Sequence, residues 1–514
     1  MSYAAPDWIA HHALWTPEQM ATIDLFSRRS FTYRALNERC ARLAAYLAAH
    51  GVERGDRVAV LCHNSTDIFE VQFACRKLGA IFVPLNWRLA QAELSAILHD
   101  AAPRLLICGE EFRGVGEQLL AEGLVAGLVG IADGAADSDY EKGIASSPPL
   151  ATSAEVTHDD VWSIMYTSGT TGRPKGAIIT YRMTIFTGLN GMMKTGVDQA
   201  ARGLTFLPLF HVGGLFLMAN FIFHAGGTNI VMRTFDAAAT LDALCDAELA
   251  PTHAFGVPTN FLLMSQLPQF SSADLSRTRC LCVGGAPSPM SLLEAYADKG
   301  VALQQGWGMT ETATIGTVLT GDAAQAKIGS AGRAVMHAEL AIVDEDMQPL
   351  PAGETGQLVI RGPTVTPGYW RQPEETARAF RDGWFLTGDA AYVDAQGYFY
   401  IVDRWKDMYI SGGENVYPAE IESVLHRMPA VLEAAVIGVG DARWGEVGCA
   451  YIVRRAGATL TAEDVVDFCS QSLARFKLPR HVVFVDEIPH TAAGKIAKPE
   501  LRRHYADAMQ ETTQ

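Results

Sequence analysis

Apolar positions in the first hundred residues alternate between helical and strand spacing. Segment 32–50 repeats them at helical intervals and ends at a glycine, and an apolar run of strand length follows at 57–62. The same order returns with a helical pattern at 68–78 and a short apolar run at 81–84. This alternation predicts an α/β fold with largely parallel sheets.

One stretch, 203–232, contains no Asp, Glu, Lys or Arg. It is interrupted by a proline, histidines, asparagines and glycine pairs, whereas a membrane-spanning helix needs roughly 20 nearly continuous apolar residues. We therefore predict a strand, a turn, a buried helix and a second strand here. Segment 132–151, which is rich in Ala, Ser, Asp and Pro, is predicted to be a surface excursion.

The size and charge of the chain restrict the class of protein. With 514 residues it exceeds what one hydrophobic core supports, so we expect two or more domains. A formal net charge of −16 argues against a nucleic-acid partner and against sustained attraction to an anionic membrane. Any polyanionic ligand must therefore be met by local cations.

The cysteines and the N-terminal residues indicate the cellular compartment in which the protein is expected. Nine cysteines are scattered without a C-x-x-C pair, and the first residues lack the basic and apolar regions of a signal peptide. These patterns predict reduced thiols, no zinc site, no integral membrane segment and a cytoplasmic protein.

Segment 166–176 has the composition of a loop that wraps phosphate. Glycines let backbone N–H groups point inward, hydroxyls donate hydrogen bonds, and Arg173 and Lys175 supply positive charge. It is not a Walker loop, because Lys175 is followed by Gly176 rather than by Ser or Thr. On composition alone, an ordinary Ser/Thr/Gly-rich surface loop is an equal alternative. The phosphate-binding candidates are Thr167, Ser168, Gly169, Thr170, Thr171, Gly172 and Lys175.

Two further blocks favour a ligand with a flat ring and phosphate. Small residues at 284–287 and 306–308 permit close approach of a ring, and Trp307 offers an aromatic face. Thr310 adds a hydroxyl, and Glu311 adds a carboxylate able to hold Mg²⁺ together with water and phosphate oxygens. A glycine-rich junction between a strand and a loop is the alternative interpretation.

In this order, the blocks resemble the motifs of the adenylate-forming superfamily, which includes acyl-CoA synthetases, aryl-CoA ligases, luciferases and peptide-synthetase adenylation domains. The resemblance extends over 31–503. It implies an α/β fold with a large N-terminal adenylation domain at 1–405, built from several subdomains with mostly parallel sheets. A small, mobile α+β domain at 406–514 is implied to carry the catalytic lysine.

For the nucleotide, the resemblance implies that the adenine of ATP stacks on Trp307, where most members carry Tyr or Phe. Asp389 would hold the ribose hydroxyls with the help of Arg404, Thr310 would contact the α-phosphate, and Glu311 would bind Mg²⁺. Thr310, Glu311 and Lys495 form the implied catalytic set. Further nucleotide contacts are implied for Gly285, Ala286, Pro287, Gly306, Gly308 and Met309.

For the acid, the resemblance implies a pocket closed on one side by His211, although a lone histidine beside apolar residues is more often a core residue. The implied pocket also includes Phe210, Val212, Gly284 and Gly308. Peptide-synthetase domains place an aspartate after the position of His211, and this chain has Val212 there. An amino acid substrate would keep an unpaired ammonium in an apolar site, so we expect a different acid.

The C-terminal segment resembles the lid of the same family. Lys495 would bridge the carboxylate and α-phosphate oxygens as charge builds, although a lysine after a glycine is otherwise an ordinary solvated charge. His490 stands where many relatives have Arg or Lys. The resemblance implies a hinge at Lys406. It also implies a coenzyme A thiol tunnel that includes Ser411, Gly412 and Gly413 after the lid turns.

These implications predict a carboxylate–CoA ligase that makes acyl-AMP and pyrophosphate from ATP and then acyl-CoA and AMP. The acid would be a medium- or long-chain fatty acid or an aryl-propenoic acid such as ferulate or 4-coumarate, with a slight preference for the fatty acid. One alternative is an acyl-AMP ligase that loads a carrier protein. Another is a nucleotide-binding or luciferase-like protein without ligase turnover. The oligomeric state, including a homodimer, stays open.

Overall fold

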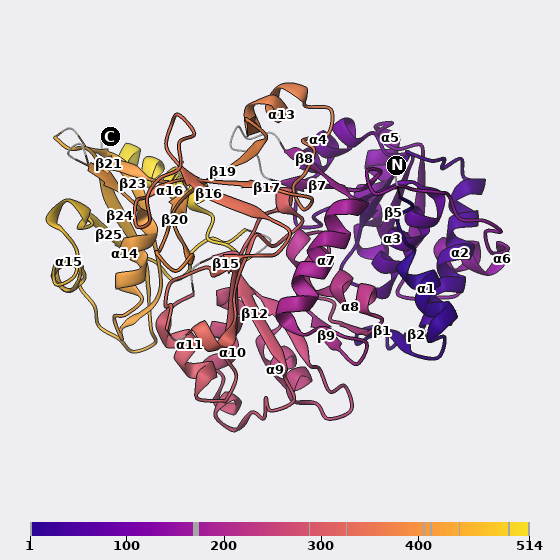
Figure 1. Cartoon of the computed structure of the whole chain (residues 1–514), viewed down its shortest axis with the longest axis horizontal. Helices are drawn as coiled ribbons and strands as arrows, with labels where there is room; N and C mark the ends of the chain where they lie inside the picture. The colour runs from indigo at the N-terminus through magenta and orange to yellow at the C-terminus, as the bar shows by residue number, and fades with distance from the viewer. Residues whose placement is uncertain are drawn as a thin grey trace.

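The computed structural model describes residues 3–167, 174–286, 288–324, 326–404, 407–411, 414–441, 443–491 and 494–511. Figure 1 shows a large body that contains most of the chain and a smaller C-terminal unit, orange to yellow, on one side of it. The α/β fold expected from the sequence is confirmed, and four sheets form its framework.

The first sheet has six strands in the order β6-β5-β3-β4-β7-β8, and only the β7–β8 pair is antiparallel. Buried aliphatic residues fill its central strands, as expected for a sheet covered on both faces. The strands predicted at 57–62 and 81–84 are confirmed as β3 and β4. The six strands are β3 (Arg57–Leu61), β4 (Ile81–Pro84), β5 (Leu105–Gly109), β6 (Gly127–Ile131), β7 (Val161–Thr167) and β8 (Lys175–Thr180).

The second sheet has nine strands in the order β15-β14-β13-β12-β11-β9-β10-β1-β2, with a parallel centre from β13 to β1. In Figure 1 its strands β9 and β12 lie below the sheet that contains β7 and β8. The nine strands are β1 (Met20–Asp24), β2 (Ser30–Thr32), β9 (Arg202–Thr205), β10 (Thr228–Val231), β11 (His253–Gly256), β12 (Cys280–Gly284), β13 (Leu303–Trp307), β14 (Thr317–Leu319) and β15 (Arg333–Ala334).

Helices cover both sheets. The charge-free stretch at 203–232 forms the end of β9, a π-helical segment η2 (Gly213–Ala219), α8 and β10, which confirms the order predicted for it. The helices of the large body are α1 (Trp8–Trp15), α2 (Tyr33–Ala49), α3 (Thr66–Leu78), α4 (Gln91–Ala101), α5 (Arg113–Ala121), α6 (Asp139–Ser146), α7 (Tyr181–Thr195), α8 (Asn220–Ala225), α9 (Ala237–Cys245), α10 (Pro258–Ser265), α11 (Met290–Ala297), α12 (Gly321–Ala324) and α13 (Pro373–Ala379).

Helix α3 joins the two sheets, because it packs against β3 and β4 of one and β1 of the other. Its polar residues are buried and paired with charges on neighbouring elements. Asp67 accepts two hydrogen bonds from Arg29, and Glu70 is paired with Arg39. Because each buried carboxylate has a hydrogen-bonded cation, the helix can be buried on all sides despite its polar sequence.

The prediction of a surface excursion at 132–151 is wrong in its middle part. This segment contains α6, whose Tyr140 is fully buried and donates a hydrogen bond of 2.9 Å to Glu70. Gly143 of the same helix lies against the ring of Tyr46 on α2. The composition resembled a loop, but a tyrosine hydroxyl with a buried carboxylate partner holds the helix against the body.

The third sheet is antiparallel, with the order β16-β17-β19-β18 and β20 paired with β19. The predicted turn at 394–397 joins β19 to β20. The strands are β16 (Glu339–Val343), β17 (Gly356–Arg361), β18 (Phe380–Arg381), β19 (Trp384–Val393) and β20 (Phe399–Arg404).

The smaller C-terminal unit has its own sheet, in the order β22-β21-β24-β23 with β25 parallel to β24, and its own helices. Its two apolar clusters contain residues from 409–505 alone. The elements are β21 (Tyr409–Ser411), β22 (Glu414–Val416), α14 (Pro418–Leu425), β23 (Val431–Asp441), β24 (Gly445–Arg454), α15 (Ala462–Ser470), β25 (His481–Phe484) and α16 (Lys498–Glu511).

Charged side chains connect β20 to this unit. Asp403 accepts a hydrogen bond of 3.0 Å from the backbone N–H of Ala419 at the start of α14. Lys498 of α16 is paired with Glu422 at 2.9 Å and lies 4.0 Å from Asp403. Asp403 lies three residues before Lys406, which is itself outside the described residues.

Within the described part of the chain, no helix is long and apolar enough to cross a membrane. All nine cysteines are free thiols, as the scattered pattern predicted, and all but Cys245 are buried.

Candidate functional site

The strands that flank the predicted phosphate loop form a hairpin. Thr167 at the end of β7 lies opposite Lys175 at the start of β8, and its hydroxyl donates to the Lys175 carbonyl at 3.4 Å. The loop between them was predicted from Ser168, Gly169, Thr170, Thr171 and Gly172, which lie outside the described residues. The hairpin therefore fixes both ends of the predicted loop.

Lys175 has two partners that its local sequence did not indicate. Its ammonium group forms an ion pair with Glu375 of α13 and lies 5.4 Å from the centre of the Tyr369 ring. Glu375 is also paired with Arg378 at 2.5 Å. The hydrogen bond and charge of Lys175 lower the pKa of Glu375 below its ordinary value.

Tyr369 connects this lysine to the predicted metal ligand. Its hydroxyl donates a hydrogen bond of 2.8 Å to Oε1 of Glu311, and the Glu311 carbonyl accepts a bond of 2.7 Å from the N–H of Thr366. The residue after Tyr369 bonds to β8, because the N–H of Trp370 donates to the carbonyl of Gly176 at 2.7 Å. The predicted metal carboxylate and the end of the phosphate loop thus belong to one hydrogen-bonded unit.

Glu311 is buried, and burial, the Glu311 charge and this hydrogen bond raise the pKa of the Tyr369 phenol, so the phenol stays a donor. Among the described residues there is no group of three or more His, Cys, Asp or Glu side chains that could hold a metal ion. A single carboxylate still suits Mg²⁺, because this ion keeps water and phosphate oxygens as most of its ligands.

Trp307 and Asp389 lie on different sheets and meet through a hydrogen bond. The indole N–H of Trp307, at the end of β13, donates to Oδ2 of Asp389 on β19 at 2.7 Å, and both side chains are buried. The N–H of Asp389 donates to the hydroxyl of Thr387 at 3.1 Å. Arg404 is the β20 neighbour of Asp389 in the sheet register. The predicted ring-stacking and ribose-binding residues are therefore brought together.

The glycines of the predicted site allow backbone segments to approach closely. A Cβ at Gly308 would lie 1.3 Å from the carbonyl oxygen of Thr314, so no other residue fits there. A Cβ at Gly284 would lie 3.0 Å from the carbonyl of Gly306 on the adjacent strand β13. Thr314 has a φ of 116°, which is strained for a β-branched residue.

The remaining residues of these two blocks lie at the strand ends. Gly285 and Ala286 follow β12, and Pro287 lies outside the described residues. Thr310 begins the short 3₁₀ turn η4 (Thr310–Thr312), is buried, and follows Met309.

Lys495 extends from the C-terminal unit to the glycine that follows β12. A Cβ at Gly285 would lie 3.0 Å from Cε and 3.7 Å from Nζ of Lys495, while Gly494 lies against the side chain of Val257. The Thr491 N–H donates to the Lys495 carbonyl at 2.6 Å, which closes the loop that carries the lysine. This loop therefore places its ammonium group at the end of β12.

His211 lies within electrostatic reach of the same ammonium group. Burial, with a further contribution from the Lys495 charge, lowers the pKa of His211 to about 3. Its Nδ1 accepts the N–H of Gly213 at 3.2 Å, so in the neutral ring the proton is on Nε2. His211 is therefore an uncharged donor at the pH at which enzymes work.

The two neighbours of His211 point to different places. Val212 is buried in the core of the large body, with residues of α2 and α3. Phe210 makes an edge contact with Trp87, with 6.5 Å between the ring centres. Of the three consecutive residues predicted for the acid pocket, His211 is the one near Lys495.

Of the predicted coenzyme A residues, the one that the structure describes, Ser411, is not brought to the Lys495 region. Ser411 is buried in β21, where it pairs with Gly445 of β24, and Gly412 and Gly413 lie outside the described residues. Figure 1 shows β21 at the outer end of the C-terminal unit, well away from β12.

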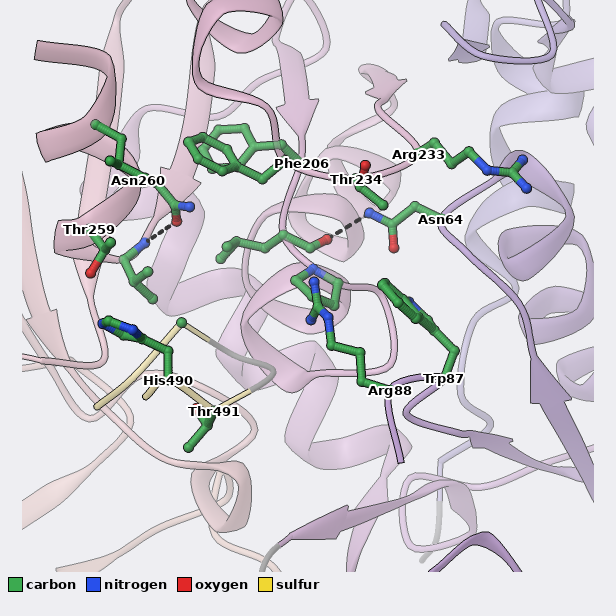
Figure 2. A pocket seen from close by; sticks show the side chains of 16 residues that line it. Asn64, Trp87, Arg88, Phe206, Arg233, Thr234, Thr259, Asn260, His490 and Thr491 are labelled. Carbon is green, nitrogen blue, oxygen red and sulfur yellow. Dashed lines mark hydrogen bonds between the residues drawn. The ribbon is translucent and has the colours of Figure 1, made fainter. Parts of the chain in front are cut away.

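A cavity of about 350 Å³ lies between the Lys495 loop and the large body. Figure 2 shows Trp87 and Arg88 on one side of it and His490 and Thr491 on the other. Its lining residues are Asn64, Trp87, Arg88, Phe206, Leu207, Pro208, Arg233, Thr234, Phe235, Val257, Thr259, Asn260, Leu263, His490, Thr491 and Gly494.

Two arginines at this cavity were missed in the sequence. The guanidinium of Arg88 lies 4.3 Å from the centre of the Trp87 ring. Arg233 is paired with Glu111 and, at 2.9 Å, with Asp133, and Figure 2 shows its guanidinium pointing away from the cavity. Neither arginine belongs to a recognisable motif, so only their spatial proximity reveals them.

Asn64 holds the chain segment that forms one wall of this cavity. Its amide donates to the carbonyls of Leu207 and Met232 at 2.9 and 3.1 Å, and its Oδ1 accepts the N–H of Leu209 at 2.9 Å. These three bonds satisfy most of the amide and fix the segment that leads to His211.

Comparisons with known proteins agree over nearly the whole chain. The family described as AMP-binding enzyme matches residues 9–370, and the AMP-binding enzyme C-terminal domain matches 420–495. A feruloyl-CoA synthase of Amycolatopsis sp is 42% identical over 97% of this chain and 98% of its own length. The long-chain-fatty-acid–CoA ligase FadD13 of Mycobacterium tuberculosis (strain ATCC 25618 / H37Rv) is 38% identical over 97% and 98%. The crystal structure of ATP-bound MatB from Rhodopseudomonas palustris covers 98% of this chain and 100% of its own, with a TM-score of 0.91 and 32% identity.

Proposed function

Because the chain belongs to the AMP-binding enzyme family and is an ATP-dependent acid–CoA ligase, we propose that Lys495 and His211 mark the place where a hydrophobic acid is adenylated. The observation that carries this proposal is the position of Lys495. It extends from the C-terminal unit to Gly285, close to the neutral His211 and at the end of the strand that leads to the nucleotide residues.

A carboxylate is a poor electrophile, so it must first become a mixed anhydride. Its oxygen attacks the α-phosphorus of ATP, a new P–O bond forms, and pyrophosphate leaves. The Lys495 ammonium group stabilises the negative charge that builds on the carboxylate and α-phosphate oxygens, in a site from which most water is excluded. Thr310, at the start of η4, would contact the same phosphate.

The nucleotide would lie between two hydrogen-bonded pairs of the large body, Trp307 with Asp389 and Tyr369 with Glu311. Trp307 would face the adenine and Asp389 would accept the ribose hydroxyls. Thr167, Lys175 and the intervening loop would bind the β- and γ-phosphates, with further backbone contacts from 285–287 and 306–309. Glu311 would hold Mg²⁺, which supplies positive charge to the phosphates.

In the second half-reaction the sulfur of coenzyme A attacks the acyl carbon, a C–S bond forms, and AMP leaves. We place the path of coenzyme A in the 350 Å³ cavity, because it leads from the Lys495 loop to Arg88, a cation suited to its phosphates. One wall of this cavity is the Lys495 loop itself, so a turn of the C-terminal unit would widen it.

The second half-reaction would require the domain division at 405/406, with a hinge at Lys406 that brings 411–413 to the acyl group. A proline at the hinge restricts the backbone, so Lys406→Pro is expected to retain acyl-AMP formation and to lose thioester formation. Single-turnover assays of each half-reaction measure both. Normal thioester turnover in this variant would refute the hinge.

The acid is proposed to be hydrophobic, either an aryl-propenoic acid such as ferulate or 4-coumarate or a fatty acid. The neutral His211 offers no charge to a second ionic group, and Val212 offers no carboxylate to an ammonium group. Both substrate classes are represented by name among the relatives, so the class of acid must be decided by assay.

The decisive assay is AMP release with ATP and coenzyme A across saturated acids from C4 to C18 and across benzoate, cinnamate, 4-coumarate and ferulate. We expect AMP release that depends on both the acid and coenzyme A. Release that requires a carrier protein instead would favour an acyl-AMP ligase, and ATP binding without turnover for any acid would contradict the proposal.

A cytoplasmic location and a homodimer stay predictions. Light scattering during size-exclusion chromatography tests the homodimer directly.

A further inference from the structure

Two cysteines lie next to each other on one face of β12. The sulfur atoms of Cys280 and Cys282 are 3.3 Å apart, and both residues are free thiols. Side chains two residues apart in a strand point to the same face, so the strand itself brings the two sulfurs together. The proposed adenylation step uses neither thiol, and this leaves the pair available for other chemistry.

Among the described residues, the side chains around this pair add no third ligand. His253 is the register neighbour of Cys280 on β11, but its Nδ1 lies 2.7 Å from the Thr252 hydroxyl and its Nε2 lies 3.1 Å from the Thr195 carbonyl. In the same part of the chain there is no group of three His, Cys, Asp or Glu side chains that could hold a metal ion. A structural zinc site needs four such ligands. The pair therefore suits a ligand that binds two sulfurs and supplies its remaining group itself.

A direct disulfide fits the pair poorly. The α-carbons of residues two apart in a strand are separated by about 6.6 Å, at the upper end of the range that a disulfide spans. The hydrogen bond to Cys282, together with burial, raises the pKa of the Cys280 thiol well above its ordinary value, so this thiol stays protonated at neutral pH. A protonated thiol is a weak nucleophile towards an oxidant. A reagent that places an atom between the two sulfurs avoids both obstacles.

Cys282 is the more accessible member of the pair. Its exposed fraction is 9%, compared with 2% for Cys280. Its register neighbours Phe255 and Gln304 are both partly exposed, and the next residue on the same face of β12, Gly284, has no side chain. A small reagent can therefore approach from the end of β12. Oε1 of Gln304 is buried without a hydrogen-bond partner among the described residues, so it offers an acceptor beside the pair.

We propose that Cys280 and Cys282 form a binding site for trivalent arsenic, taken up as arsenous acid, and that its occupation inhibits adenylation. Arsenic(III) is a soft, thiophilic centre, as the sulfur ligands require. Each sulfur displaces one hydroxyl from As(OH)₃, so two As–S bonds form and two As–O bonds break. The two thiol protons leave with these hydroxyls as two water molecules. Arsenic keeps its oxidation state, and its remaining hydroxyl can donate to Gln304.

The site lies close in the chain to the residues proposed for adenylation. Gly285, against which Lys495 lies, follows Cys282 by three residues. Both cysteines belong to the same apolar cluster as Met218 of η2. Because protein interiors are closely packed, an atom added in this cluster shifts the strand that leads to Gly285. Bound arsenic should therefore slow acyl-AMP formation.

The test is a titration of the full-length enzyme with sodium arsenite. Plasma mass spectrometry measures the arsenic bound per chain, and pyrophosphate exchange measures acyl-AMP formation. We expect one arsenic per chain and a loss of exchange that 2,3-dimercaptopropanol restores, whereas 2-mercaptoethanol at the same thiol concentration does not. After digestion with trypsin without added thiol, arsenic should remain on the fragment 280–299, which contains these two cysteines and no other.

Removal of one thiol distinguishes the pair from single cysteines. Two linked contacts exceed the affinity of either alone by roughly 10²- to 10⁴-fold, so Cys280→Ala and Cys282→Ala should each raise the arsenite concentration for half-maximal inhibition by at least ~10²-fold. Both variants should retain exchange without arsenite, since neither thiol takes part in the chemistry. Cys245→Ala is the matched control, because Cys245 on α9 is partly exposed and lies outside the pair. It should keep the wild-type sensitivity.

Each outcome decides the inference separately from the proposed function. Arsenic content that is unchanged in Cys280→Ala or lost in Cys245→Ala would overturn it, as would a wild-type protein that binds no arsenic. Arsenic on the fragment 280–299 with full exchange activity would overturn the inhibition. If Cys280→Ala fails to fold, Cys282→Ala and the location of the arsenic still decide. The arsenic content requires no turnover, so failure of the acid assays leaves this test in place.

Discussion

The proposed nucleotide end and the proposed acid end of the site are built from different interactions. At the nucleotide end, residues far apart in the chain are joined by polar contacts, Trp307 with Asp389 and Tyr369 with Glu311. At the acid end, the contacts are between glycines and the edge of Phe255. We therefore expect recognition of the nucleotide to depend on individual hydrogen-bond donors, and recognition of the acid to depend on the shape of the space beside these glycines.

The Lys495→Ala variant should have the largest effect, because Lys495 lies where the two ends meet. Loss of one charge-stabilising donor typically lowers the rate by ~10²- to 10³-fold, so acyl-AMP formation should fall by this factor. Thioester formation from supplied acyl-AMP should continue, since the lysine is assigned to the first step alone. Pyrophosphate exchange and single-turnover thioester assays measure the two steps separately.

Lys477→Ala provides the control for this variant. Lys477 belongs to the same C-terminal unit and pairs with Glu420 at 2.7 Å, away from the strand end that Lys495 contacts. It should leave both steps close to the wild-type rate. Equal losses of both steps in Lys495→Ala would contradict the assignment of the lysine to adenylation.

The Trp307→Phe variant tests the nucleotide end with a smaller change. It keeps an aromatic face and removes the N–H that bonds to Asp389, a hydrogen bond to a charged group that is worth roughly 1.5 kcal/mol or more. We expect the KM for ATP to rise ~10-fold, with little change in the preference among acids. Steady-state kinetics with ATP and 2′-deoxy-ATP would measure this change in KM.

Trp384→Phe on the same strand as Asp389 is the matched control, because Trp384 is stacked with Arg361 instead. A change in acid preference in Trp307→Phe would show that the nucleotide end and the acid end are not independent.

A weaker effect is expected from Tyr369→Phe. The variant removes the hydroxyl that holds Glu311, so the carboxylate is less fixed and the Mg²⁺ concentration for half-maximal activity should rise by a few-fold. Electron paramagnetic resonance of Mn²⁺ in the ATP complex gives an affinity that does not depend on turnover. An unchanged Mn²⁺ affinity would remove Tyr369 from this positioning role.

The smallest effect concerns pH and His490. A hydrogen bond of 2.7 Å to Glu433 raises the pKa of His490 in the folded protein above its ordinary value of about 6.5. The stabilisation is fully present below pH ~6.5 and is lost as the pH rises through the raised pKa. Because both side chains are partly exposed, we expect less than about 1 kcal/mol.

Thermal unfolding between pH 6 and 9 measures this contribution, with His490→Asn as the comparison. The difference in Tm between the two proteins should shrink as the pH rises. A difference that grows with pH would contradict the sign of the shift. The raised pKa of His490 also favours its charged form, at the position where the family resemblance implies Arg or Lys in many members.

The sequence named candidate residues for the nucleotide end, and their roles stay predictions, but it did not indicate their pairings. Trp307, Asp389 and Glu311 stand in recognisable motifs, while Tyr369 and Glu375 become partners only when the third sheet and α13 fold against β8. Pairs separated by up to 200 residues in the chain leave no local pattern. The elements themselves were predicted well where their periodicity is strong, as in α2 and β3.

The acid end was the less predictable of the two. Phe255 stands in a short strand with no motif, and its contacts with Gly213 and Gly284 come from segments distant in the chain, so no local pattern indicates them. Arg88 and the cavity beside it were missed for the same reason. The error at α6 has a related cause, since the contact of Tyr140 with Glu70 outweighs a loop-like composition.

The close crossing at Gly308 sets a limit on how this enzyme can be redesigned. A saturation library at this position should return glycine alone, because any side chain would overlap the Thr314 carbonyl, whereas Gly114, with open space around it, should tolerate many replacements. Substitutions that broaden the range of acids are therefore expected at neighbouring side chains rather than at Gly308, where the two backbone segments leave no room for a side chain.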